Sequence, residues 1–157
     1  MLVVMVDIFI VAMLIWAAAS DLATMTIPNS IVSLFLIGYI VIAPFAGISM
    51  LPGLWSGLLA LAGTLVLFSC GWIGGGDAKL FTVTALWLGL DHLVPLVLAT
   101  SVAGAMLTIG MLALRSQNYS ATWLGRPWVA RLLDPQRGVP YGIAIAFAGC
   151  AVLATSA

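Results

Sequence analysis

Long apolar runs dominate this 157-residue chain and leave few folds open to it. Hydrophobic residues make up 64% of the chain and charged residues only 6%, and the mean hydropathy is +1.24. A soluble domain carries about 25% charged residues, so this chain has too few polar groups to cover a globular surface. The composition excludes a soluble domain, a disordered chain and a nucleic-acid binder, and it predicts a polytopic membrane protein.

Turn-forming residues divide the apolar sequence into six runs, near the length of about 20 residues that a membrane-spanning helix needs. The expected helices cover about residues 2–19, 30–48, 53–72, 78–90, 93–114 and 139–156. The fourth run is short for a span, so it would need to tilt, thin the bilayer or start within the preceding glycines, and the alternative is a re-entrant segment. We therefore expect an all-α bundle of six transmembrane helices in a single membrane-embedded domain, residues 1–157.

The basic residues predict how this bundle is oriented. Loop 115–138 holds four arginines and one acidic residue, and an excess of Arg and Lys is typical of cytoplasmic loops. These arginines are Arg115, Arg126, Arg131 and Arg137. Counting crossings from this loop places both termini outside, and it places Asp21, Asp77 and Lys79 on the cytoplasmic side.

Residues 127–133, within this loop, are predicted to form a short helix at the membrane interface. Trp128 and Leu132 would share one face of it, with Arg131 elsewhere. Two roles stay open for this segment: a basic loop that sets the topology on anionic lipid, and a docking surface for a substrate.

Asp21 and Asp77 are the residues best suited to chemistry. Asp21 follows the first expected helix, and Asp77 opens the fourth directly after three glycines. An ionisable group at membrane depth is costly and is a functional candidate by default. Structural roles stay open as well, because Asp77 is placed to cap its helix and Asp21 to lie in an interfacial turn beside water.

Two neighbouring carboxylates favour acid–base hydrolysis. They share one proton, because ionising both is costly. The ionised carboxylate can activate a water while the protonated one donates to a peptide carbonyl, which is aspartic-peptidase chemistry and uses no metal. The chain offers no rival site: it has no Glu, its one histidine, His92, falls on the opposite membrane face, and Cys70 and Cys150 lie far apart.

Three segments resemble motifs of the bacterial type IV prepilin peptidases. Residues 74–80 look like the GxGD motif of that family, and residues 21–29 are similar to its first aspartate motif. Residues 139–146 resemble the Pro-Tyr-Gly run that opens the last helix of the short members. The three segments follow the family's order, and the resemblance covers essentially the whole chain.

This resemblance implies roles for single residues. Asp21 and Asp77 match the two catalytic aspartates. The residues that would shape the site are Gly74, Gly75, Gly76, Lys79, Pro28 and Asn29, and those that would serve as its scaffold are Pro140, Tyr141 and Gly142. The stripe of small residues Gly142, Ala146 and Gly149 predicts close helix packing.

The resemblance also implies a reaction and partners. The substrate would be a prepilin, with a short basic leader ahead of a hydrophobic helix, cut after a glycine at the cytoplasmic face of the bacterial inner membrane. Short members serve tight-adherence (Flp-type) pili, so the implied partners are membrane lipid and the pilus assembly machinery, without a cofactor, a metal or nucleic acid.

Two departures from the family pattern matter. Larger members carry a cysteine-bearing cytoplasmic region and also N-methylate the pilin, and since nothing here matches that region we expect peptidase activity alone. Residues 22–26 are neutral where relatives are often basic.

The alternative functions are a small proton- or ion-coupled transporter and a non-catalytic subunit of a pilus assembly.

Overall fold

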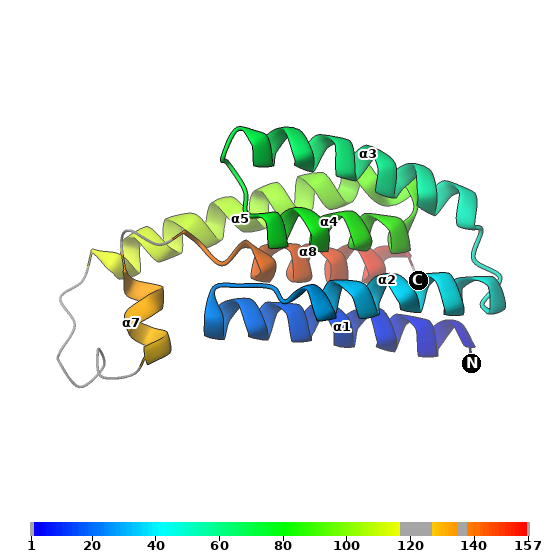
Figure 1. Ribbon diagram of the computed structural model, residues 1–157, viewed down its shortest axis with the longest axis horizontal. Coiled ribbons are helices and arrows are strands. Elements are labelled where there is room, and N and C mark those ends of the chain that lie inside the picture. Colours follow the sequence, from blue (N-terminus) through cyan, green and yellow to red (C-terminus); the bar gives the residue numbers. More distant parts are fainter. Residues whose placement is uncertain (1, 117–126, 135–137, 157) are drawn as a thin grey trace.

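The structure, a computed structural model, describes residues 2–116, 127–134 and 138–156 as an all-helical bundle (Figure 1). Its elements are α1 (Leu2–Thr24), α2 (Asn29–Phe45), α3 (Met50–Ser69), α4 (Gly75–Leu88), the 3-10 helix η1 (Leu90–His92), α5 (Leu93–Arg115), α7 (Pro127–Leu133) and α8 (Tyr141–Ser156). The all-α class is confirmed. The long helices run side by side, and α1 begins and α8 ends at the end of the bundle opposite α7. Arg126 and Arg137 lie outside the described residues.

Helix α4 is the shortest of the long helices, with Gly74 before it and Gly89 at a φ of 81° after it, and it lies at the centre of the bundle. It packs against α3, α2 and α8, and Trp87 near its end is surrounded by aromatic rings. The indole N–H of Trp87 donates to the backbone oxygen of Phe35 at 3.0 Å. The buried residues of α4 are Ala78, Leu80, Phe81, Val83, Thr84, Ala85, Leu86 and Trp87. Since protein covers most of this helix, its length need not match the thickness of a bilayer.

The outer surface of the bundle is apolar. Large side chains such as Ile8, Leu58 and Met106 are each more than half exposed. Three segments are long and apolar enough to cross a membrane, namely Leu2–Thr24, Met50–Ser69 and Leu90–Arg115. Helices α2 and α8 are apolar but shorter. An apolar surface of this extent needs lipid around it, so the protein is an integral membrane protein.

The end of α1 and the start of α4, which lie near Asp21 and Asp77, differ from the predicted helix bounds. Helix α1 does not end at residue 19 but continues through Asp21 to Thr24, because no Gly or Pro interrupts it before Pro28. It stops where Met25 takes a left-handed φ of 57°. Helix α4 begins at Gly75 instead of residue 78, so the glycines supply its first turn. Asp77 is therefore the third residue of α4 and not the residue before it.

The other ends shift by up to three residues. Helix α2 ends at Phe45 instead of 48, and α3 covers Met50–Ser69 instead of 53–72. Pro52 falls in the first turn of α3, where its missing N–H costs no hydrogen bond, and Gly71 follows the helix with a φ of 73°. Helix α8 begins at Tyr141 and not at residue 139.

The packing of α3 on α4 gives a first testable prediction. A methyl group at Gly53 would meet the hydroxyl of Tyr39 and, at 2.6 Å, the backbone oxygen of Leu86. Overpacking costs about 1–3 kcal/mol, so we expect Gly53→Ala to lower the unfolding midpoint in detergent by several degrees. Gly63→Ala on the same helix is the matched control, because its methyl would meet nothing within 4 Å. Equal midpoints for the two variants would contradict this packing.

Candidate active site

Asp21 and Asp77 line one cavity of about 370 Å³ at the end of the bundle near α7. Asp21 comes from the last turns of α1 and Asp77 from the first turn of α4. The carboxyl groups of Asp77 and Asp21 are close enough for their charges to repel each other. The rest of the cavity wall consists of Met25, Gly71, Trp72, Ile73, Gly74, Gly138, Val139, Pro140 and Tyr141. The tertiary fold thus brings the two aspartates into a shared space.

The N-terminus of α8 holds the side chain of Asp21. The backbone N–H of Gly142, the second residue of α8, donates to Asp21 Oδ2 at 2.8 Å. The first N–H groups of a helix have no partner within the helix, and the helix dipole is positive there, so both favour a carboxylate. The side chain of Asp21 is only 5% exposed. It is therefore buried against α8 and does not lie in a turn beside water.

A side chain larger than that of glycine at position 142 would displace Asp21. A methyl group there would lie 2.8 Å from Asp21 Oδ2 and 3.0 Å from Ile27 Cδ1. Sequence reasoning placed Gly142 in the scaffold and the small-residue stripe, and it missed the hydrogen bond to Asp21. The stripe does pack closely, since Gly149 lies against Leu14 of α1. Both the motif resemblance and the small-residue stripe pointed to residue 142, but neither predicted its contact with Asp21.

The glycines before Asp77 allow α4 to start close to the link between α1 and α2. Gly74 is extended, and a methyl group there would lie 2.9 Å from Asp77 Oδ2, so the Asp77 carboxyl lies against the residue that precedes its helix. Gly76 faces Ile27: a methyl group at Gly76 would lie 3.2 Å from Ile27 Cβ and 3.5 Å from its backbone nitrogen. Asp77 thus lies in the first turn of its helix and also faces the cavity.

The other residues predicted to shape the site join the same segments. Lys79 Nζ donates to Asn29 Oδ1 at 3.0 Å, which links α4 to the start of α2. Pro28 is the extended residue before α2, and Gly75 packs near Phe68. These side chains are not part of the described cavity wall, so they position its segments without facing the two carboxyl groups.

Helix α7 lies at the same end of the bundle, as Figure 1 shows. The predicted helix over residues 127–133 is confirmed. Arg131 Nη1 donates to the backbone oxygen of Ala23 at 3.3 Å, next to the end of α1. Arg115 at the end of α5 donates to the backbone oxygens of Leu132 at 3.1 Å and Gly138 at 2.9 Å. Two arginines thus connect α7 to the segments that carry the cavity.

The remaining candidates lie elsewhere. His92 is in η1, at the opposite end of the bundle, where its Nδ1 is 2.9 Å from the backbone oxygen of Leu88. Asp91 is also in η1 and is exposed, and Cys70 and Cys150 are free thiols. Among the residues that the structure describes, no three His, Cys, Asp or Glu side chains gather as metal ligands do.

Comparison with known proteins places these features in a family. The model of the type IV leader peptidase family matches residues 8–109, a region that contains both aspartates and the three glycines. The prepilin leader peptidase/N-methyltransferase of Aeromonas hydrophila is 33% identical over 106 residues, covering 51% of this chain and 37% of that protein. The protein of the same description from Aeromonas salmonicida strain A449 is also 33% identical, covering 51% of this chain and 36% of its own length.

The chain thus aligns with little more than a third of the length of these relatives. No solved structure matches it. The family model, however, spans more than half of the chain. The protein therefore belongs to the type IV leader peptidase family, as the resemblance of its motifs predicted.

Proposed function

We propose that this protein is an aspartic endopeptidase that removes the leader from prepilins. The observation that carries the proposal is the cavity shared by Asp21 and Asp77, because both residues lie within the segment that the family model matches. The description of the Aeromonas relatives supports prepilins as the substrate class. The Flp-type pilins are the subclass that the sequence resemblance favours.

The two carboxyl groups can hydrolyse a peptide bond by acid–base catalysis. The ionised carboxylate takes a proton from a water whose oxygen bonds to the scissile carbonyl carbon, while the protonated carboxyl gives its proton to the carbonyl oxygen. The diol that results collapses as the C–N bond breaks. One carboxyl then donates a proton to the leaving nitrogen, and the other takes a proton from a diol hydroxyl. This restores one ionised and one protonated group.

We further propose that α1 to α5 and α8 make six crossings of the bacterial inner membrane, with both termini outside. Their side-by-side arrangement supports this topology (Figure 1). The described cations Lys79, Arg115 and Arg131 all lie toward the end of the bundle that carries the aspartates. The positive-inside rule assigns this end to the cytoplasm, where the leader of a prepilin is located.

Mass spectrometry of a co-expressed Flp-type prepilin tests the activity. We expect the prepilin to lose its leader, and the new N-terminus to carry no methyl group, because the chain shows no motif for a methyl donor. The enzyme from Aeromonas hydrophila, co-expressed with its own prepilin, is the positive control for both changes. A full-length prepilin beside correctly inserted protein would refute the proposed peptidase, and a methylated product would refute the single activity.

A further inference from the structure

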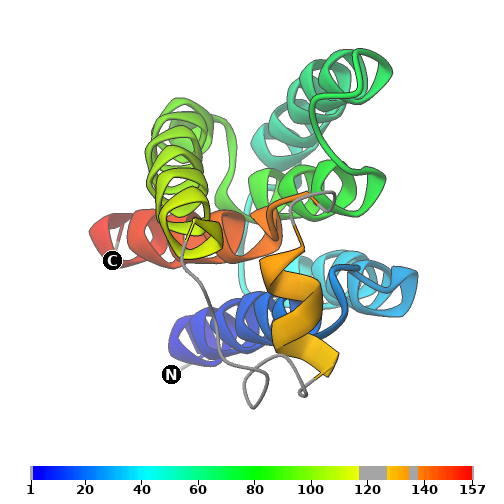
Figure 2. The ribbon, with the colours of Figure 1, turned by 90° about the vertical axis from the view of Figure 1, so that its left-hand side faces the viewer.

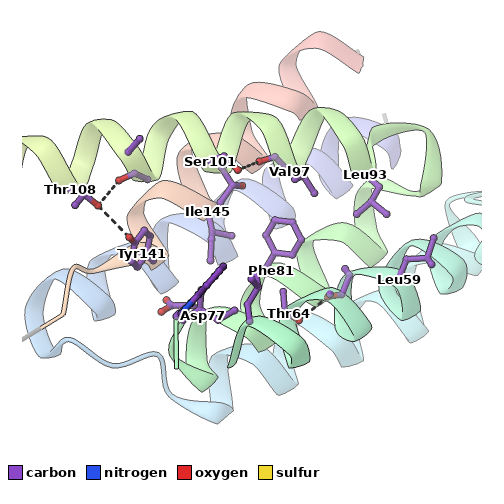
Figure 3. A pocket seen from close by; sticks show the side chains of 18 of the residues that line it. Leu59, Thr64, Asp77, Phe81, Leu93, Val97, Ser101, Thr108, Tyr141 and Ile145 are labelled. Atoms are coloured by element: carbon purple, nitrogen blue, oxygen red, sulfur yellow. Dashed lines mark hydrogen bonds between the residues drawn. The ribbon is translucent and has the colours of Figure 1, made fainter. Parts of the chain in front are cut away.

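A second and larger cavity leads away from the aspartates along the bundle. Its volume is about 910 Å³. Helix α3 packs on α4 and helix α5 packs on α8, and Figure 2 shows α3 and α5 standing apart above these two helices. Figure 3 shows Leu59 and Leu93 at one end of the cavity, and Asp77 and Tyr141 at the other. We refer to this space between α3 and α5 as the groove.

The groove adjoins the cavity of the two aspartates. Both are lined by Trp72, Ile73, Asp77 and Tyr141. Phe81 and Ile145 form part of the groove floor between these shared residues and the distant end. A molecule that occupies the groove therefore ends beside Asp77.

The two faces of α5 differ in the size of their side chains. The face that lines the groove carries five small residues, namely Thr100, Ser101, Gly104, Ala105 and Thr108, beside the larger Leu93, Val97 and Ile109. The exposed face that does not line it carries large apolar residues, namely Val94, Leu98, Val102, Met106 and Leu112. Large apolar side chains suit fluid lipid, whereas small residues and hydroxyls are typical of interfaces between transmembrane helices.

Helix α3 also presents small residues to the groove. Ala60, Gly63 and Thr64 line it together with the larger Leu59 and Leu67, whereas Leu58 and Leu65 are exposed away from it. A methyl group at Gly63 would meet nothing within 4 Å, so the backbone of α3 is open to close approach there. Both walls of the groove therefore carry the surface that a further helix needs.

One hydroxyl in the groove lacks a hydrogen-bond partner. The Thr100 Oγ1 atom is buried and has no partner among the described residues. Its neighbours are satisfied, because Ser101 donates to the Val97 oxygen at 2.8 Å and Thr108 to the Gly104 oxygen at 2.7 Å. A buried polar group without a partner is costly.

We infer that the groove binds the apolar helix of the substrate that follows the cleavage site. This inference rests on the proposed function. The groove extends along α5 from Leu93 to Ile109, which at 1.5 Å per residue accommodates about 16 helical residues, or about 24 Å. The N-terminal end of a helix bound in this way lies at Asp77, so the peptide bond ahead of it enters the cavity of the two aspartates. Recognition of the helix thereby positions the bond that is cut.

Filling the groove tests this inference. Trp at Ser101 would occupy the groove, whereas Trp at Val102 on the same helix would face away from it. Each variant is assayed on the whole prepilin and on a short peptide that contains the leader and the cleavage site without the helix. We expect Ser101→Trp to lower the ratio of kcat/KM for the prepilin to kcat/KM for the peptide by at least about tenfold, because remote binding energy is lost. Val102→Trp should leave this ratio unchanged, and equal ratios in both variants would overturn the inference.

Photo-crosslinking gives a second and independent readout. Benzoylphenylalanine replaces Ala105 in the groove or its neighbour Met106 outside it, in an Asp77→Asn background that keeps the substrate intact. We expect a covalent adduct with the prepilin helix from position 105 and none from position 106. Adducts from position 105 with lipid only would overturn the inference. If the wild-type protein cleaves neither substrate, the proposed function fails, while the crosslink still reports whether the groove binds the helix.

Discussion

Replacing Asp21 or Asp77 by asparagine is expected to abolish leader cleavage while the protein still inserts into the membrane. Asparagine keeps the size of the side chain, and at position 21 it keeps an oxygen that can accept the hydrogen bond from the Gly142 N–H. It removes the ionisable proton on which the mechanism depends. General acid–base catalysis contributes about 10²–10⁴-fold to a rate, so we expect each variant to lose at least about a hundredfold. The gel shift of a co-expressed prepilin measures this loss.

Asp7→Asn is the matched control for this experiment. Asp7 lies on the same helix as Asp21 but is not part of the described cavity wall, so this variant should cleave like the wild type. If Asp21→Asn or Asp77→Asn cleaves at a near wild-type rate, the replaced aspartate is not catalytic and has only a structural role. The two-aspartate mechanism would then be wrong, even if the other variant were inactive.

Gly142→Ala is expected to give the second large loss of cleavage. The added methyl would lie 2.8 Å from Asp21 Oδ2 and 3.0 Å from Asp21 Cβ, so the carboxylate must move away from its present position. A misplacement of about 1 Å at a catalytic group can cost about a hundredfold in rate. We expect a fall of that order in kcat, with a smaller change in KM because the groove is left intact. Steady-state kinetics with purified protein in detergent measure both constants.

Gly149→Ala separates this effect from a loss of packing. Gly149 lies on the same helix, and its methyl would meet Leu14 Cδ1 at 2.8 Å, which is as close as the contact at Gly142. Leu14 is not part of the described cavity wall. The unfolding midpoint should therefore fall in both variants, and kcat should fall strongly only in Gly142→Ala. Equal losses of kcat would show that Gly142 acts through general packing and does not position Asp21.

Much of this protein can be predicted from its sequence. The apolar runs predict helices because a chain in lipid must satisfy its backbone hydrogen bonds internally. The motif around Asp77 and the run Pro140-Tyr141-Gly142 identified the family that the comparisons confirmed. The helix ends were predicted least accurately. The start of α4 was missed because three glycines are typical of a turn, and the end of α1 was missed because no residue after position 19 marks where the helix stops. The catalytic roles of the aspartates stay a prediction.

The tertiary structure alone decided what surrounds the aspartates. The hydrogen bond from Gly142 to Asp21 joins residues 121 positions apart, and the groove depends on the separation of α3 from α5. Spacing within the sequence reports which residues share a face of one helix, because that depends on the 3.6-residue period alone. Which faces of different helices meet depends on how the helices pack against one another, and this packing is set by all of the side chains in the bundle together. The sequence by itself therefore determined the helices and the residues available for chemistry, and only the packing of the helices brought those residues to one cavity with a groove beside it.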